Sequence, residues 1–304
     1  MRALVTGGAG FIGSNIATAL LERGDEVTVF DNMSGGRSDA IPDGARFVDG
    51  DLRDPDALES VCDVDLIFHQ AAVRSVPRSL DEPRITHDSN VNGTVNLLLA
   101  AERFSVQRLV YASSSSVYGD VGEQRNVETM APNPRSPYAA SKLTGEYYCK
   151  VWAQLGRLPT TSLRYFNVFG PGQHPESKYS AVFPAFIAAL KDGQPPTIYG
   201  DGEQSRDFTY IDDVVAANLL AAETVAADGL VMNVASGRPK SVNSVLKTVS
   251  DELGTWIDPV HDEPRVGDIR NSYADISLAR STLSWEPATE WEEAVRTTVG
   301  WFSG

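Results

Sequence analysis

The sequence lacks the features that mark several large classes of protein. Its 304 residues include only two cysteines, Cys62 and Cys149, so it has no disulfide framework, and we expect both to be reduced packing residues. Its four histidines show no metal-ligand spacing, and we expect no metal site. It has no apolar run long enough for a membrane span, and after Met1 and Arg2 it enters a glycine-rich segment rather than a signal peptide. These absences predict a cytoplasmic protein without a membrane partner.

Positive charge is also scarce. The chain has 26 Lys and Arg residues against 41 Asp and Glu residues, which gives a formal net charge of -15. Binding to nucleic acid requires a basic surface, and no basic stripe is present, so we expect no nucleic acid partner. A small anionic ligand is still compatible with this charge, because a few converging arginines are enough to hold one. The 42% apolar and 22% charged residues indicate a globular chain, long enough for one large domain or two ordinary ones.

The first 31 residues read as strand, glycine turn, helix and strand. Residues 2–6 form a short apolar strand, glycines fall at positions 7, 10 and 13, the helix covers 14–23, and a strand over 26–30 ends at Asp31. This context is typical of dinucleotide binding, because the glycines admit a pyrophosphate and the helix N-terminus faces its charge. An acid at position 31 binds ribose hydroxyls and repels a 2'-phosphate, which favours NAD over NADP. The alternative is a glycine turn that serves only close packing.

Strands and helices then alternate as far as residue 112. Strands are predicted at 46–48, 65–69 and 108–112, and helices at 54–61 and 90–103, a pattern that specifies a doubly wound parallel sheet. Ligands bind at the carboxyl ends of such strands. His69 is expected to be a satisfied structural histidine, whereas Asn92 is either a cofactor-supporting residue or an interior amide.

The segment from Tyr111 to Lys142 carries the candidate chemistry. Ser136 suits a helix cap and Pro137 the first helical position, so Tyr138 and Lys142 should lie one turn apart on one face. An ammonium close to a phenol lowers the phenol's pKa and makes the phenolate a base. A hydroxyl from Ser114 or a neighbour would bind the substrate oxygen that loses its proton. By itself the pair is weak evidence, because tyrosine and lysine at this spacing are usually a surface pair.

Several motifs occur together and extend this pattern. They are Gly7-x-x-Gly10-x-x-Gly13, Asp31, His69 to Ala72, Ser113 to Gly119, Tyr138-x-x-x-Lys142, Arg164 to Pro171 and Tyr199 to Asp213. Together they resemble the extended short-chain dehydrogenase/reductase family, and over residues 2 to about 285 the chain is most similar to its NAD-dependent UDP-sugar 4-epimerases. The resemblance implies a Rossmann-type α/β fold.

The expected division is an NAD-binding Rossmann domain over 1–166 and a smaller mixed α/β substrate lobe over 167–304, with some segments returning to the first domain. In the second part the sequence predicts a loop at 170–180 and further elements. These are helices at 181–191, 211–223, 241–253 and 290–302 and strands at 197–199 and 231–235.

The resemblance also implies residue roles. Ser114, Tyr138 and Lys142 would be catalytic. The NAD-binding residues would be Gly7, Gly10, Phe11, Ile12, Gly13, Asp31, Asn32, Asp51, Leu52, Ala71, Ala72, Asn92, Ser113, Tyr138, Lys142 and Tyr165. The UDP-sugar would be held by Ser114, Ser115, Asn167, Tyr199, Arg206, Arg265, Asp268 and Ser272. Without the resemblance, each arginine would be read as a solvated surface charge.

Family differences narrow the reaction. Relatives that dehydrate the sugar carry an Asp-Glu pair where this chain has Ser115 and Ser116, and decarboxylating relatives usually carry a glutamate in the second position. Epimerases of UDP-glucuronate share the serines but typically have threonine at the position of Asn167. The resemblance therefore implies C4 epimerisation of a neutral UDP-hexose through a transient 4-keto sugar, with Tyr138 removing the O4 proton through or alongside Ser114.

Two other interpretations stay open at this point. One is a UDP-glucuronate 4-epimerase or another nucleotide-sugar oxidoreductase, and the other is a non-catalytic NAD-binding sensor on the same fold. A small residue at Ser272 implies room for an N-acetyl group, so UDP-N-acetylglucosamine is expected as a substrate besides UDP-glucose. Relatives often dimerise through two helices from each subunit, and the apolar faces near 91–99 and 147–152 would serve a homodimer or belong to the core.

Overall fold

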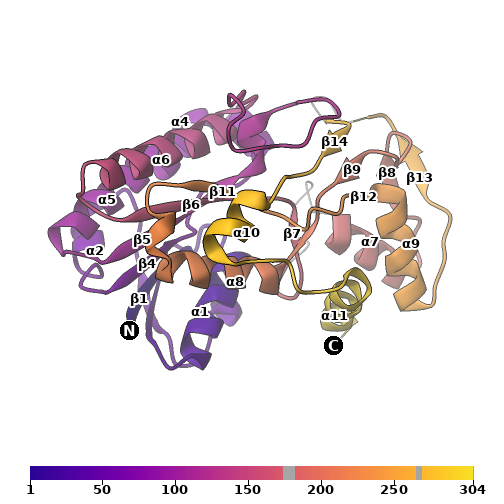
Figure 1. The fold of residues 1–304 in the computed structure, drawn as a ribbon. Coiled ribbons are helices and arrows are strands. Elements are labelled where there is room, and N and C mark those ends of the chain that lie inside the picture. Colours follow the sequence, from indigo (N-terminus) through magenta and orange to yellow (C-terminus); the bar gives the residue numbers. More distant parts are fainter. Residues whose placement is uncertain (174–181, 265–268, 304) are drawn as a thin grey trace.

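Seven parallel strands form the central sheet (Figure 1). The computed structural model describes residues 1–173, 182–264 and 269–303. The strands are β1 (Arg2–Thr6), β2 (Glu26–Asp31), β3 (Arg46–Asp49), β4 (Leu66–His69), β5 (Arg108–Ser114), β6 (Thr160–Tyr165) and β11 (Val231–Val234). Their order is β11-β6-β5-β4-β1-β2-β3, so the chain reverses direction across the sheet between β1 and β4. In doubly wound sheets a ligand binds at this reversal, beyond the carboxyl ends of the strands.

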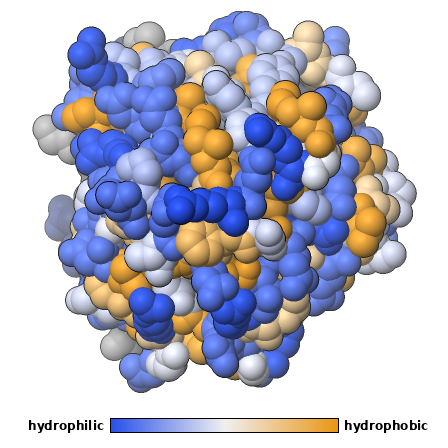
Figure 2. Space-filling model, turned by 90° about the vertical axis from the view of Figure 1, so that its left-hand side faces the viewer, coloured by the Kyte–Doolittle hydropathy of each residue, from blue (hydrophilic) through white to orange (hydrophobic). Residues whose placement is uncertain are grey.

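Helices cover both faces of the sheet. Helices α1 (Phe11–Glu22) and α8 (Ile211–Glu223) contact each other on one face, and α2 (Pro55–Glu59), α5 (Gly93–Arg103) and α6 (Pro137–Gln154) cover the other (Figure 1). Short helices α3 (Val76–Asp81) and α4 (Pro83–His87) and a π-helical segment (Asp88–Asn92) lead into α5. Figure 2 views the molecule from the left of Figure 1, where α2 and α5 lie, and apolar groups interrupt the hydrophilic surface there.

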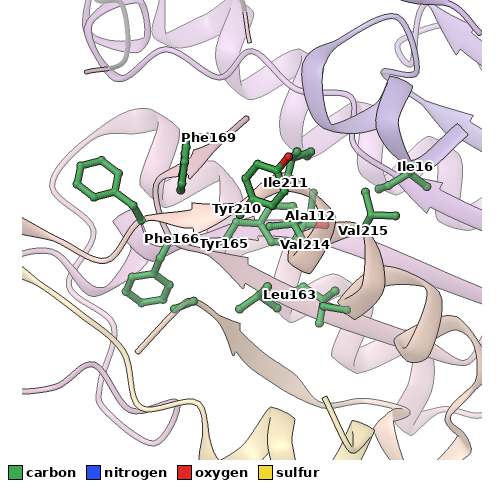
Figure 3. Close-up of a cluster of buried hydrophobic side chains, with 14 of the residues drawn as sticks. Ile16, Ala112, Leu163, Tyr165, Phe166, Phe169, Tyr210, Ile211, Val214 and Val215 are labelled. Atoms are coloured by element: carbon green, nitrogen blue, oxygen red, sulfur yellow. The ribbon is translucent and has the colours of Figure 1, made fainter. Parts of the chain in front are cut away.

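Two hydrophobic cores lie on opposite sides of the sheet, because successive strand residues point to opposite faces. On β1, Leu4 belongs to the core under α5 and α6, whereas Val5 belongs to the core under α1 and α8. Figure 3 shows part of the second core, in which Val214 and Val215 of α8 lie near Leu163 of β6. Burial on both faces explains why these strands read as continuous apolar runs.

A smaller lobe follows the sheet and is built from short elements. It contains α7 (Val182–Lys191), α9 (Val242–Leu253), α11 (Trp291–Ser303), β8 (Thr197–Tyr199), β9 (Ser205–Arg206), β12 (Lys240–Ser241), β13 (Val260–Asp262) and β14 (Asn271–Ser272). Strands β7 (Val168–Phe169) and β10 (Thr209–Tyr210) pair where the two parts meet, and α10 (Ser277–Leu283) contacts β11. Short 3₁₀ turns cover Ser38–Ala40, Ser115–Tyr118 and Val225–Ala227.

Most predicted elements are confirmed, with three differences. Helix α1 begins at Phe11 rather than at residue 14, because the glycine turn already ends at Gly10. The predicted helix over 90–103 contains π-helical turns as far as Asn92. The strand predicted for the lobe at 231–235 instead pairs in parallel with β6 as the edge of the main sheet, and the helix predicted for the lobe at 211–223 covers one face of that sheet beside α1. The predicted loop at 170–180 falls mostly on residues outside the described ranges. Within the described residues, no helix has the length and apolarity to cross a membrane.

Candidate active site

The glycine turn brings β1, α1 and the end of β4 into close contact. A Cβ atom added to Gly13 would lie 2.2 Å from the carbonyl oxygen of Gly7, and one added to Gly7 would lie 2.6 Å from the Ala71 nitrogen. Gly7 also has a φ of 69°, which favours glycine. Gly10 caps α1 without a side-chain hydrogen bond, and the first turn, which includes Phe11 and Ile12, carries no acid. The first amides of α1 are therefore available to a pyrophosphate.

Asp31 lies at the end of β2 with 9% of its surface exposed. Its Oδ2 accepts a hydrogen bond from the Ala9 amide at 3.1 Å, and its Oδ1 accepts one from the Met33 amide at 2.9 Å. Burial raises the pKa of Asp31, while the two amides oppose that rise. A carboxylate has about four acceptor positions, so two are left for ribose hydroxyls. The glycine turn and Asp31 together fit the adenosine diphosphate part of NAD.

Asn32 and Asp51 meet at the same edge of the sheet, after β2 and β3. The Asn32 amide donates to Asp51 Oδ2 at 2.8 Å, and the Arg53 guanidinium donates to both Asp51 oxygens at 2.9 and 2.7 Å. The hydrogen bonds from Arg53 hold the pKa of Asp51 well below its usual value. Leu52 is buried beside them and Ala72 is partly buried. These predicted cofactor residues therefore lie at the carboxyl ends of β2, β3 and β4, as expected.

Helix α6 positions the predicted catalytic residues. Ser136 caps it by accepting a hydrogen bond from the Ala139 amide at 3.1 Å, and Pro137 is its first residue. The Tyr138 hydroxyl lies near the Ser114 hydroxyl at the end of β5, and this neighbour acts to lower the pKa of Tyr138. The buried Lys142 ammonium donates to the Ala112 carbonyl at 2.8 Å. The structure therefore brings Ser114, Tyr138 and Lys142 to the end of one strand.

The electrostatics of Tyr138 differ from the prediction. Burial raises the pKa of Tyr138, and the two opposing influences are the Ser114 hydrogen bond and the charge of Arg74. The expectation that Lys142 lowers this pKa is not met, because the Lys142 ammonium is directed at the Ala112 carbonyl. Burial in turn lowers the pKa of Lys142 to about 8. No sequence pattern indicates a role for Arg74, which the turn after β4 brings near Tyr138.

Ser113 faces away from Ser114 because adjacent strand residues alternate. Its hydroxyl donates to the buried carboxylate of Glu146, which also accepts two hydrogen bonds from Arg164 at 2.8 and 2.7 Å. The side chain of Ser113 is therefore hydrogen-bonded inside the protein, and only its backbone can contact a cofactor. Glu146 was missed from the sequence, although it lies four residues after Lys142 on the same helix face.

The substrate half of the site centres on Asp207. Asn167, which has a positive φ of 31°, donates its side-chain amide to the Asp207 carbonyl at 3.0 Å. The Asp207 amide donates to the Ser272 carbonyl at 2.7 Å, and Ser272 is paired with Arg206 between strands β14 and β9. Three predicted substrate residues, Asn167, Arg206 and Ser272, therefore lie around one aspartate.

The Asp207 side chain is fully buried and joins three segments. Its Oδ1 accepts from the amide and hydroxyl of Ser236 at 2.8 and 2.5 Å, and its Oδ2 accepts from the amides of Gly237 and Ala274 at 3.0 and 3.2 Å. Burial raises the pKa of this carboxyl against these four hydrogen bonds. The sequence did not reveal this role, because the partners are far apart along the chain.

The other predicted substrate residues are less informative. Tyr199 ends β8, and its carbonyl accepts a hydrogen bond from Gln204. Ser115 is partly buried at the start of the turn after β5. Arg265 and Asp268 lie outside the described residues.

Two predicted cofactor residues are not placed as expected. Asn92 is exposed and donates to Asp88 at 3.0 Å, whereas Asn90 is buried and donates to the Val73 carbonyl and to Ser141 at 3.2 and 2.9 Å. The π-helical segment, which has more residues per turn than an α-helix, turns position 90 toward the site and position 92 to solvent. The interior amide is therefore Asn90.

The second of these residues is Tyr165. Its hydroxyl donates to Asn218 at 2.8 Å and accepts from Gln70 at 3.1 Å, so its side chain is hydrogen-bonded inside the protein.

The expectation for His69 is confirmed. Its ring nitrogens bond the hydroxyls of Thr6 at 2.7 Å and Thr94 at 2.9 Å, and burial lowers its pKa to about 3. A neutral, fully bonded histidine has a structural role. Within residues 1–173, 182–264 and 269–303, no group of three His, Cys, Asp or Glu side chains is arranged to hold a metal ion.

Comparison with known proteins agrees with this geometry. The sequence profile described as the NAD dependent epimerase/dehydratase family matches residues 3–235. A putative UDP-glucose 4-epimerase from Methanocaldococcus jannaschii is 38% identical over 98% of this chain and 97% of its own length. A UDP-glucuronate 4-epimerase from Thermodesulfobacterium geofontis is 31% identical over 98% of this chain and 95% of its own length.

Two solved structures have nearly the same fold over the whole chain. The UDP-glucose 4-epimerase of Thermotoga maritima, solved with UDP-glucose, has a TM-score of 0.96 and 37% identity, and covers 100% of this chain and 99% of its own. The UDP-N-acetylglucosamine 4-epimerase of Methanobrevibacter ruminantium, solved with UDP-N-acetylmuramic acid, has a TM-score of 0.95 and 40% identity, and covers 99% of this chain and 98% of its own.

Proposed function

Because the chain belongs to the NAD dependent epimerase/dehydratase family, we propose that it interconverts UDP-glucose and UDP-galactose by inverting C4 of the sugar while NAD stays bound. The observation that carries this proposal is that Tyr138 and Ser114 lie together at the end of β5, at the same edge of the sheet as the glycine turn and Asp31. A proton-accepting phenol at the same sheet edge as a dinucleotide-binding glycine turn is the arrangement that oxidation of a secondary alcohol requires.

The residues divide the work of this reaction. Bound NAD would supply reversible hydride acceptance, held by the α1 amides and Asp31. Tyr138 removes the proton from O4 and returns it after the 4-keto sugar has rotated to present its other face. Ser114 forms a hydrogen bond to the same sugar oxygen. Lys142 supports the nicotinamide ribose. Asn167 and Arg206 hold the diphosphate, so the sugar can rotate while the nucleotide stays fixed.

We also propose that the enzyme accepts sugars with either a hydroxyl or an N-acetyl group at C2. Ser272 supports this, because it is small and pairs with Arg206 in the substrate half of the site. The relative from Methanobrevibacter ruminantium, named for UDP-N-acetylglucosamine, gives this proposal independent support.

The proposal is tested by incubating the purified protein with UDP-glucose, UDP-galactose, their N-acetyl forms and UDP-glucuronate, and separating the products by chromatography. We expect epimers of the neutral sugars to form without added coenzyme in stoichiometric amount. Absorbance from reduced NAD should not accumulate, because nothing is oxidised overall. A steady increase in that absorbance would instead indicate an oxidoreductase, and no turnover of any sugar would indicate a sensor.

One observation favours a second candidate, a UDP-glucuronate 4-epimerase. The positive charge of Arg74 acts to lower the pKa of Tyr138, so it lies near the reacting group. There it would attract a carboxylate on the sugar. The relative from Thermodesulfobacterium geofontis bears that name. Turnover of UDP-glucuronate that is lost in Arg74→Gln, with turnover of UDP-glucose retained, would establish this second activity.

We further propose that the protein is a cytoplasmic homodimer without a nucleic acid partner. Its cysteines are free and buried, and its formal net charge is -15. Helices α5 and α6, with the residue that follows α6, expose apolar or aromatic side chains on one side of the molecule: Leu99, Tyr147, Tyr148, Val151 and Leu155. An exposed apolar face of this kind suits a self-complementary contact.

Sedimentation of native protein and of Leu155→Glu tests the dimer. The native protein should sediment as a dimer and the variant as a monomer. The control is Val260→Glu, because Val260 is 54% exposed and lies in β13 of the smaller lobe. A native monomer would contradict the proposal.

A further inference from the structure

Asn233 on β11 has a fully buried side chain that bonds three separate segments of the chain. The Tyr118 hydroxyl donates to Asn233 Oδ1 at 2.7 Å, and Asn233 Nδ2 donates to the backbone carbonyls of Asn126 and Asp275, each at 3.0 Å. The two carbonyls can only accept hydrogen bonds, so the amide nitrogen must face them and the amide oxygen must face the Tyr118 hydroxyl. Both Nδ2 protons are therefore used inside the protein.

Tyr118 belongs to the turn that follows the candidate catalytic strand. This turn, Ser115–Tyr118, begins directly after Ser114 at the end of β5. The Tyr118 side chain is buried, and the guanidinium of Arg164 on β6 lies over its ring at 4.6 Å from the centroid. The hydroxyl bond to Asn233 therefore joins β11 to the last residue of the turn whose first residue follows Ser114.

Asn126 and Asp275 pair with each other in the substrate half of the site. The Asn126 amide donates to the Tyr273 carbonyl at 2.9 Å, and the Asn126 carbonyl accepts from the Asp275 amide at 3.0 Å. Tyr273 directly follows β14, whose last residue is Ser272. Because Asn233 bonds the carbonyls of both Asn126 and Asp275, it holds this pairing next to β14.

We propose that Asn233 is a positioning residue that fixes the distance between the turn after β5 and strand β14. This role rests on the proposed function, in which Ser114 meets O4 of the sugar and Ser272 lies beside its C2 substituent. The sugar ring spans these two elements, so the distance between them determines where C4 lies relative to Tyr138. Asn233 is 0% exposed, so it acts only through the residues that it bonds.

The residues proposed to hold the diphosphate are bonded in a different way. Asn167 donates to the Asp207 carbonyl, the Asp207 amide donates to the Ser272 carbonyl, and Arg206 is paired with Ser272 between β9 and β14. None of these bonds includes Asn233. Loss of the Asn233 amide should therefore leave the sugar less constrained while the UDP part stays anchored.

The first test replaces Asn233 by leucine, which has a similar size and shape but no hydrogen-bonding side-chain atom. In Asn233→Leu, kcat for UDP-glucose should fall about tenfold, because a misplaced reacting carbon slows the chemical step. The inhibition constant of UDP and the amount of bound NAD should stay close to native. An unchanged kcat, or UDP binding weakened as much as kcat, would overturn the proposal.

The matched control is Asn218→Leu. Asn218 on α8 is also 0% exposed and accepts from a tyrosine hydroxyl, but its Nδ2 donates to the Val214 carbonyl of its own helix. This variant loses a buried amide of the same kind without releasing residues next to β14, so its kcat should stay close to native. Equal loss of kcat in the two leucine variants would mean that general destabilisation is responsible and would overturn the proposal.

Tyr118→Phe breaks only the bond between Asn233 and the turn. The buried ring is kept, so this variant tests the link even where Asn233→Leu fails to fold. It should lower kcat about threefold, the equivalent of one weak hydrogen bond. In an Asn233→Leu background it should cause no further loss, because its partner is already absent. No loss in the single variant, or additive losses in the double variant, would overturn the proposal.

Hydrogen exchange without substrate separates this role from the proposed function. In Asn233→Leu, the amides of Asn126 and Asp275 should exchange about tenfold faster than in the native protein, because two hydrogen bonds that hold their pairing are lost. The Ser14 amide, which donates to the Gly10 carbonyl in α1, should exchange at the native rate. Unchanged exchange at Asn126 and Asp275 would overturn the positioning role whatever the enzyme turns over. A native protein that turns over no UDP-hexose would contradict the proposed function alone.

Discussion

The cofactor half of the candidate site is built from the ends of neighbouring parallel strands, whereas the substrate half is built from two-residue strands that come from distant parts of the chain. In the first half, β1, β2, β4 and β5 place Gly7, Asp31, Ala71 and Ser114 through the hydrogen bonds of one sheet. In the second half, Asn167, Arg206 and Ser272 are placed through the bonds of Asp207 and the short pairing of β9 with β14.

This difference predicts how each half responds to mutation. A side chain in the cofactor half can be removed without moving its neighbours, because the sheet backbone holds them. Loss of one buried side chain in the substrate half should displace several ligand contacts together. Variants of the two halves should therefore be distinguishable by their turnover, their affinity for NAD and their affinity for the UDP-sugar.

The largest expected effect is that of Tyr138→Phe in the cofactor half. Loss of a general base should lower turnover by about a hundredfold or more, while UDP binding and the free energy of unfolding stay close to native. The matched control is Tyr147→Phe on the same helix, where the side chain is exposed and turnover should be unchanged. Turnover of Tyr138→Phe within threefold of native would remove Tyr138 from this role.

The next effect concerns cofactor affinity. Asp31→Ala should weaken NAD about thirtyfold, since two hydrogen bonds to the ribose of about 1 kcal/mol each are lost, and should weaken NADP much less. Titration of the cofactor-free protein with both dinucleotides measures this. Asp49→Ala is the control, because Asp49 pairs with Asp31 in the adjacent strand but is exposed. A native preference for NADP would show that the cofactor assignment is wrong.

In the substrate half, Asp207→Asn should act on several contacts at once. We call the four hydrogen bonds accepted by the Asp207 carboxylate the clamp. An asparagine turns an NH2 group toward two of these four donors, so the clamp is weakened and KM for the UDP-sugar should rise about tenfold. NAD affinity should stay native. Asp213→Asn is the control, because Asp213 is also buried and accepts hydrogen bonds from the amides of Ala288 and Thr289. Equal changes of KM in both variants would mean that general destabilisation, and not the clamp, raises KM.

The same contrast explains what was predictable from the sequence. The sheet, the glycine turn, Asp31 and the Ser114 and Tyr138 pair follow from local patterns, because strand ends of a parallel sheet share an edge. Asn92 was chosen in place of Asn90 because a π-helical segment leaves no clear trace in the sequence.

What local patterns do not contain is the tertiary environment of each side chain. The direction of the Lys142 ammonium, the charge of Arg74 beside Tyr138 and the clamp of Asp207 all depend on residues that meet only in the folded chain. The strand at 231–235 was assigned to the lobe for the same reason, since its pairing with β6 is not local.

The smallest and most selective effect is expected at Ser272, the substrate-half residue paired with Arg206. Ser272 is 5% exposed, so a tyrosine in its place must displace whatever lies beside it. If the sugar lies there, Ser272→Tyr should lower kcat/KM for UDP-N-acetylglucosamine by about tenfold and leave UDP-glucose near native, because only the first carries the bulky group. Ser272→Ala is the control and should keep both activities. Equal loss on both sugars would mean that the tyrosine disrupts the clamp around Asp207, and no loss on either would place Ser272 away from the sugar.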